Sequence, residues 1–231
     1  MKSTGQIFSF AFVVIALAEI YSRYAENDML HWVAKPLLML VLLAFFYVSL
    51  QGRSNKVTKL ITWGLVFSWV GDVLLMFESS EQPLFFMGGL GAFLTTHVLY
   101  ILAFKASVTD SSKSIFKTRI IAIFPFILIG GYFYYELFPE LAELRIPVGV
   151  YTAVIVTMVI FALNRIDSVN VHSFRLVYYG AIIFMISDLL LAINKFLVTD
   201  GFAHADVYII GTYILAQGLI VSGVLVETTA E

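Results

Sequence analysis

Cysteine is absent from the sequence, and charge is scarce: Asp, Glu, Lys and Arg make up only 13% of the residues. Without cysteine the chain has no disulfide, no thiolate nucleophile and no thiolate metal site. The low charge, together with 60% hydrophobic residues and a mean hydropathy of +0.92, excludes a soluble domain, because too little polar surface remains to cover a core. The apolar excess must therefore face lipid.

Eight apolar stretches dominate the sequence, each of about 17 to 25 residues, the length that crosses a hydrocarbon layer of about 30 Å. Short polar connectors separate them, and the continuous apolar runs are unlike the alternating strands of a membrane barrel. The predicted fold class is all-α: a polytopic bundle of eight transmembrane helices, with residues 1–231 forming a single integral membrane domain. The predicted spans are residues 6–24, 34–50, 57–77, 83–105, 118–138, 146–164, 174–197 and 206–226.

Positive charge is distributed unequally over the two ends of this predicted bundle. Of the 14 Lys and Arg residues, ten fall on the side of the N-terminus and four on the other side, so the positive-inside rule places both termini in the cytoplasm. The N-terminal MKSTGQIF lacks a small-residue cleavage site, and we expect it to lead into the first span rather than to be a signal peptide. Because topology accounts for the basic residues, no nucleic-acid binding is expected.

Two aspartates occur in matching contexts in the two halves of the chain. Asp72 in SWVGDVLLMF and Asp188 in FMISDLLLAINKF are 116 residues apart, each late in an outward-running span. Lys35 and Arg145, each closely followed by a proline, open the second and sixth spans. The pattern suggests two parallel repeats of four helices. Chance similarity among Leu-rich helices is the alternative.

An ionisable residue inside a span costs about 2.5 to 3.5 kcal/mol on insertion scales, so a functional role is the first hypothesis for Asp72 and Asp188. The alternative is a hydrogen bond between helices, or a side chain that reaches the interface. We expect the two carboxyl groups to face one another across a polar cavity among the third, fourth, seventh and eighth spans, open on the non-cytoplasmic side. A separation beyond about 12 Å would prevent a joint role.

Other polar side chains are predicted to lie in the same half of the membrane, namely Glu19, Lys35, Tyr213 and Gln217. His97 lies deeper, about 20 Å below the start of its span at about 1.5 Å per residue. It would either line the floor of the cavity or be a hydrogen-bonded histidine of the core. Glu19 would either join the site or extend to the interface.

Lys195 follows Asp188 by seven residues, which on an α-helix is two turns outward on the same face, about 10 Å away. An ammonium group at that level can hold a phosphate as a point charge, and Lys35 is the second candidate for this role. The alternative is that Lys195 only extends to the interface and anchors the helix end.

Several segments, SWVGDVLLM, HVLY after FFMGGLGAF, GAIIFMISDLLLAINKF and YILAQGLI, together resemble the YhhN-like lysoplasmalogenase family of eight-helix membrane proteins. The resemblance covers nearly the whole chain. It implies hydrolysis of the vinyl ether bond of lysoplasmalogens, which releases a fatty aldehyde and glycerophosphocholine or glycerophosphoethanolamine. It places catalysis at Asp72 and Asp188, and the remaining family motifs fall on Lys35, His97, Tyr100, Asn194, Lys195, Tyr213 and Gln217.

The chemistry of vinyl ether hydrolysis suits two carboxyl groups. An acid protonates the β-carbon, and water captures the resulting oxocarbenium ion as a hemiacetal that collapses to aldehyde and alcohol. Burial disfavours the charged form of a carboxyl group, and a neighbouring carboxyl adds to this effect, so one can stay protonated while its partner is ionised. Glycosidase carboxylate pairs follow the same logic. No metal and no cofactor are expected, and the partners are a lysophospholipid substrate and membrane lipids.

Two other classes of protein use similar features. A proton-coupled carrier also has buried carboxylates and broken helices, and Gly88, Gly89 and Gly91 are a candidate break. Close packing of small residues explains these glycines as well. A non-catalytic lipid-binding protein is the other alternative. Aldehyde release from a lysoplasmalogen would separate an enzyme from both of these classes.

The expected location is a bacterial inner membrane or its equivalent, in which the protein is a multi-pass integral membrane protein.

Overall fold

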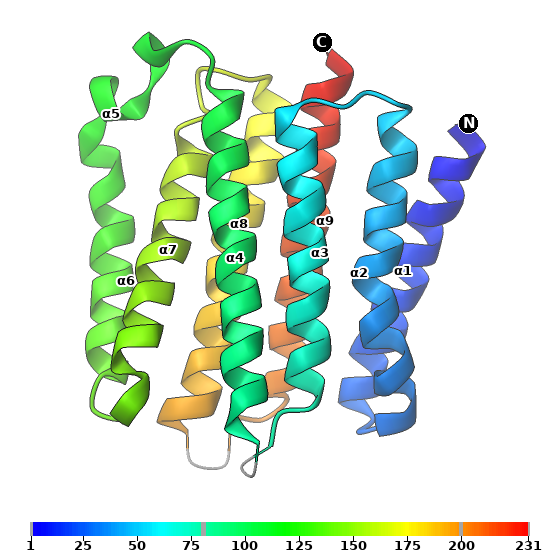
Figure 1. Ribbon diagram of the computed structural model, residues 1–231, viewed down its shortest axis with the longest axis vertical. Coiled ribbons are helices and arrows are strands. Elements are labelled where there is room, and N and C mark those ends of the chain that lie inside the picture. Colours follow the sequence, from blue (N-terminus) through cyan, green and yellow to red (C-terminus); the bar gives the residue numbers. More distant parts are fainter. Residues whose placement is uncertain (1, 80–81, 199–200, 231) are drawn as a thin grey trace.

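Eight helices long and apolar enough to cross a membrane run side by side in a computed structural model, which describes residues 2–79, 82–198 and 201–230 (Figure 1). They are α1 (Lys2–Tyr24), α2 (Asp28–Leu50), α3 (Lys56–Met76), α4 (Pro83–Ser107), α6 (Phe124–Leu137), α7 (Arg145–Leu163), α8 (Val171–Ala192) and α9 (Ala205–Ala230). The short helix α5 (Ile115–Thr118) and three 3₁₀ turns (Ser111–Lys113, Ile120–Ile123 and Ala142–Leu144) lie in connections, and a π-helical turn (Ile193–Leu197) extends α8. The described residues contain no strand. The predicted all-α class and its eight spans are confirmed.

The outer surface of the bundle is apolar, as a lipid-facing surface must be. Large side chains such as Phe10, Tyr47 and Leu128 are at least two-thirds exposed, because each span carries apolar residues around most of its circumference. The two ends of the chain lie at the same end of the bundle (Figure 1). An even number of crossings requires this arrangement.

The two halves of the chain pack their helices in matching pairs. The most extensive helix contacts are those of α3 with α4 and of α8 with α9. In the first pair, a Cβ on Gly64 would overlap the ring of Tyr100, and in the second, a Cβ on Gly180 would lie 3.0 Å from the carbonyl oxygen of Ala216. The two glycines are 116 residues apart, and so are their two partners. The same register in both pairs supports the predicted pair of four-helix repeats.

The second helix begins at Asp28 rather than at residue 34, where the prediction placed it. The side chain of Asn27 accepts a hydrogen bond from the backbone N–H of Leu30, which caps the helix, and Asp28 suits the positive end of the helix dipole. The polar composition of this stretch resembles that of a connector. Lys35 therefore does not open the helix as expected but lies about 10 Å along it, at about 1.5 Å per residue.

The glycines of α4 do not break the helix, which is continuous from Pro83 to Ser107. A Cβ on Gly89 would lie 2.6 Å from the side chain of Leu75 on α3, so this glycine serves the close approach of the two helices. The break considered for a carrier is therefore not found at these residues, and close packing explains Gly89, whereas a Cβ on Gly91 would meet nothing within 4 Å.

We predict that Gly180→Ala destabilises the bundle. The added methyl group would lie 2.8 Å from the Ile220 side chain and 3.0 Å from the Ala216 carbonyl oxygen, so α8 and α9 would have to separate. Overpacking of this kind costs about 1–3 kcal/mol. Gly211→Ala is the matched control, because a Cβ there meets nothing within 4 Å and alanine favours the helix. Equal melting temperatures of the two variants in detergent would contradict the tight contact.

Candidate active site

A polar pocket of about 470 Å³ lies in the half of the bundle opposite the chain termini, within the size range of small-molecule sites. Asp72 and Asp188 both line it, with contributions from α1, α2, α3, α4, α8 and α9. The pocket expected between the two aspartates is therefore present, but it extends to α1 and α2, which the prediction left out. Its ionisable and hydroxyl-bearing residues are Glu19, Arg23, Asp28, His31, Lys35, Asp72, Glu78, Ser187, Asp188, Asp206 and Tyr213.

Asp72 is held at the pocket by contacts from two neighbouring helices. It is buried, and Tyr213 of α9 donates a hydrogen bond of 2.8 Å to its Oδ2. The ring of Phe93 on α4 comes so close to Gly71 that a Cβ there would lie 2.7 Å away. Phe93 also packs edge-on against Tyr213. The carboxyl group of Asp72 is thus fixed by one hydrogen bond beside an aromatic wall.

Asp188 has a different set of neighbours. Tyr151 of α7 donates a hydrogen bond of 2.5 Å to its Oδ2, and His97 Nε2 lies 3.6 Å from the same oxygen, too far for a hydrogen bond. Both ring nitrogens of His97 are buried without a hydrogen-bond partner among the described residues. Sequence reasoning missed Tyr151, and the only available signal was a hydroxyl group in an apolar span.

The repeat relates the neighbours of the two aspartates. His97 and Tyr213 are 116 residues apart, as Asp72 and Asp188 are. Asp72 on α3 meets Tyr213 on α9, and Asp188 on α8 approaches His97 on α4. The predicted pairing of the aspartates through pseudo-symmetry is therefore visible in their surroundings, with a tyrosine in one half and a histidine in the other.

Charged groups from α1 and α2 complete the polar pocket. Glu19 is fully buried and lies 2.8 Å from His31 Nδ1, a partner that the sequence prediction missed because the start of α2 was taken for a connector. Lys35 lines the pocket and makes no hydrogen bond or close ion pair with any residue that the structure describes. Its charge acts on the carboxyl group of Asp72 from a distance, so the ammonium group can still bind a further anion.

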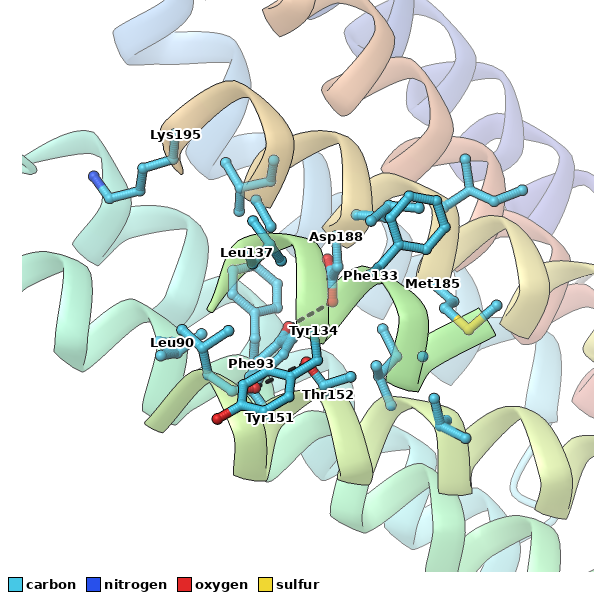
Figure 2. A pocket seen from close by; sticks show the side chains of 18 of the residues that line it. Leu90, Phe93, Phe133, Tyr134, Leu137, Tyr151, Thr152, Met185, Asp188 and Lys195 are labelled. Carbon is cyan, nitrogen blue, oxygen red and sulfur yellow. Dashed lines mark hydrogen bonds between the residues drawn. The ribbon is translucent and has the colours of Figure 1, made fainter. Parts of the chain in front are cut away.

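Lys195 lines the same apolar cavity as Asp188, but its ammonium group already has a partner. It forms an ion pair with Glu78, beyond the end of α3, and its ammonium lies 4.2 Å from the centre of the Phe86 ring. Figure 2 shows its side chain directed away from Asp188. Lys195 lies within the π-helical turn, where the α-helical rise used for the prediction no longer applies. Its contact with a phosphate stays a prediction. Lys35 is the lysine that lines the polar pocket with both aspartates, among the residues described.

Three other predicted contact residues lie outside the polar pocket. Tyr100 donates a hydrogen bond of 2.7 Å to Gln217, which donates one of 2.9 Å to Ser68, so these buried side chains join α3, α4 and α9. Asn194 accepts a hydrogen bond from the backbone of Phe202 and holds the connection before α9. All three support the walls of the site, and their contact with a substrate stays a prediction.

An apolar cavity of about 340 Å³ adjoins the polar pocket. It lies among α4, α6, α7 and α8, and its lining is dominated by aliphatic and aromatic side chains. Four residues line both spaces: Leu75, Phe93, Asp188 and Leu191. Within the described part of the chain, Asp188 is the only acidic residue that lines the apolar cavity, and Figure 2 shows it among the surrounding apolar side chains.

The fold and the site define a polytopic membrane protein with an acidic pocket inside its helix bundle. The chain belongs to the YhhN family, whose model matches residues 30–224. It is similar to lysoplasmalogenase TMEM86B of Homo sapiens, 28% identical over 210 residues that cover 90% of this chain and 82% of that protein. It is also similar to lysoplasmalogenase TMEM86A of Bos taurus (31%) and of Homo sapiens (32%), each over 68% of this chain and 61% of the relative. No solved structure shows significant similarity to the chain.

We predict that Lys35→Cys reacts with a water-soluble thiol reagent, because residue 35 lines an open polar pocket. The chain has no other cysteine, so the label reports this one position. Gln217→Cys is the control: Gln217 is fully buried outside the pocket, so a thiol there should react only after denaturation. Mass spectrometry measures the labelled fraction. An unlabelled Lys35→Cys in the folded protein would argue against a hydrated pocket.

Proposed function

We propose that this protein is a lysoplasmalogenase, which hydrolyses the vinyl ether bond of a lysophospholipid to a fatty aldehyde and glycerophosphocholine or glycerophosphoethanolamine. The proposal rests on one observation: two aspartates within the membrane spans of a YhhN-family chain line the same polar pocket. The similar mammalian proteins, which are named lysoplasmalogenases, support it. A lysophospholipid dissolved in the bilayer reaches such a site without leaving the membrane.

The proposed reaction needs one proton donor and one water molecule. A carboxyl group gives its proton to the alkene carbon farther from the ether oxygen, and the electron pair of the double bond forms the new C–H bond. The adjacent carbon becomes an oxocarbenium ion. Water adds to that carbon and loses a proton to a carboxylate, and the hemiacetal then collapses, breaking the C–O bond to glycerol. The proton count is restored at the end of the cycle.

The neighbours of the aspartates suit these steps. When two carboxyl groups are partly shielded from water by the bundle, one can hold the proton while the other stays ionised and stabilises the cationic intermediate. Tyr213 and Tyr151 each fix one carboxyl group by a hydrogen bond. The unpaired ammonium of Lys35 in the same pocket suits the phosphate of the headgroup.

We further propose that the spans act as one integral membrane domain with both termini in the cytoplasm, in a bacterial inner membrane or its equivalent. The excess of Lys and Arg at the termini side supports this orientation. The polar pocket then opens on the non-cytoplasmic side, and the substrate is drawn from that leaflet.

We predict that Asp72→Asn and Asp188→Asn each lower aldehyde release from a lysoplasmalogen by about 10²- to 10⁴-fold, because Asn cannot give or take the proton. Asn keeps the size and accepts the same tyrosine hydrogen bond, so both variants should stay folded in detergent. Asp167→Asn, a half-exposed position paired with Arg119, makes the same change outside the pocket and should stay active. An ester lysophospholipid serves as control substrate. Substantial activity in either aspartate variant would remove that residue from the mechanism.

We also predict that Lys35→Met raises KM by roughly tenfold or more with little change in kcat, since a charge-assisted contact with phosphate is worth about 1.5–3 kcal/mol. Lys195→Met is the matched comparison and should change KM much less, because the Lys195 ammonium is already paired with Glu78. The reverse order of the two effects would assign the phosphate to Lys195, as the helical spacing first suggested.

A further inference from the structure

The apolar cavity has the dimensions of a lipid chain. Its lining follows α8 and its π-helical extension from Ile182 to Phe196, a length of about 20 Å at about 1.5 Å per residue. One lipid chain covers half of a bilayer core of about 30 Å, that is about 15 Å. The cavity as a whole is therefore long enough for a hydrocarbon chain, and about 9 Å of this length, from Asp188 to Ile182, lies on the Met185 side of Asp188.

The cavity also opens where hydrocarbon is the solvent. Two of its lining residues, Ile129 on α6 and Ile186 on α8, are 42% and 40% exposed and belong to the lipid-facing surface of the bundle. The cavity therefore reaches the lipid-facing surface of the bundle at α6 and at α8. An apolar chain passes through such an opening without entering water, whereas a polar ligand would have to cross the hydrocarbon layer.

We propose that the apolar cavity binds the hydrocarbon chain of the lysophospholipid and limits the chain length that the protein accepts. This inference rests on the proposed function, and it assigns the part of the substrate site that binds the hydrocarbon chain. The glycerol and phosphate occupy the polar pocket, and the chain runs from Asp188 past Met185 toward Gly130. Figure 2 shows Met185 and Lys195 on opposite sides of Asp188, so the chain leads away from the Lys195 end.

This placement puts the reacting bond at Asp188. The vinyl ether joins the chain to glycerol, and Asp188 is the carboxyl group, among the described residues, that lines both spaces. Its proton goes to the alkene carbon on the chain side, which leaves an Asp188 carboxylate and an oxocarbenium ion. Water from the polar pocket adds to the carbon bonded to oxygen, and the proton that it loses returns to Asp188. Asp72, which lines only the polar pocket, stays on the glycerol side.

The test uses a glycine that forms part of the cavity wall. Gly130 is buried in α6 and lines the cavity, and a Cβ there would lie 2.5 Å from the Val156 side chain, which lines it too. The larger side chain of Gly130→Leu must therefore displace Val156 or occupy the cavity. Gly131→Leu is the matched control, because residue 131 is exposed and a Cβ there meets nothing within 4 Å. Met185→Phe is a second cavity-filling variant that leaves α6 unchanged, and it decides the matter if Gly130→Leu does not fold.

The measured quantity is equilibrium binding of saturated alkyl-ether lysophosphocholines, which cannot be cleaved, to protein in lipid nanodiscs. We expect Gly130→Leu and Met185→Phe to weaken binding of the hexadecyl compound by about tenfold, the effect of excluding about two buried methylene groups. The octyl compound should lose less affinity than the hexadecyl compound, because less of its chain lies beyond Met185, and Gly131→Leu should match the unchanged protein with both. Folded cavity variants that bind both compounds normally would overturn the chain site.

A parallel assay of aldehyde release separates this inference from the proposed function. If the unchanged protein releases no aldehyde but the cavity variants lose the hexadecyl compound selectively, the chain site stands and the proposed reaction fails. If the unchanged protein is active and the variants show no dependence on chain length in binding or in KM, the reaction stands and the chain site fails.

Discussion

Each of the two intramembrane aspartates is held by a tyrosine hydroxyl from a neighbouring helix, and the packing of the bundle keeps these contacts in place. A carboxyl group in a span costs about 2.5 to 3.5 kcal/mol on insertion scales, so it is tolerated where partners and a water-accessible space are present. Tyr213 and Tyr151 supply the partners, and the polar pocket supplies the space. The hydrogen bond to Tyr213 spans two helices, so α9 must stay next to α3. The buried link through Gln217, one turn further along α9, holds the same two helices together.

The internal repeat explains why the protein has two such aspartates, and its divergence explains why they differ. The positions that face them, Tyr213 and His97, correspond by the same offset of 116 residues. Tyr213 donates a hydrogen bond to Asp72, whereas His97 stays 3.6 Å from Asp188 and Tyr151 of α7 makes the hydrogen bond instead. As a result, Asp188 in the second repeat lines the apolar cavity as well as the polar pocket, whereas Asp72 in the first repeat lines only the polar pocket.

Hydropathy alone was sufficient to predict the spans, because lipid imposes one length and one composition on every membrane helix. The cost of charge in hydrocarbon was sufficient to single out Asp72 and Asp188. Contacts between distant helices were not predictable from spacing: the sequence does not show that Glu78 pairs with Lys195, that Tyr151 reaches Asp188 or that His31 meets Glu19. Local geometry failed at two places for identifiable reasons. The Asn27 cap lengthens α2, and the end of α8 is a π-helical turn rather than the continuous α-helix that the prediction assumed for Lys195.

A lysophospholipid carries its vinyl ether at the boundary between a charged headgroup and an apolar chain, and this position constrains any enzyme that cleaves it. Hydrolysis needs water, which the chain excludes, and a proton donor close to the chain-side carbon, where water is scarce. A site that meets both demands must place its acid where a polar space and an apolar space meet. Asp188 has this position in the bundle, since it lines both spaces, with α1, α2 and α9 contributing only to the polar pocket and α6 and α7 only to the apolar cavity. The headgroup is then recognised by charge and the chain by buried apolar area, and a change in α6 or α7 alters the chain side without touching the polar pocket.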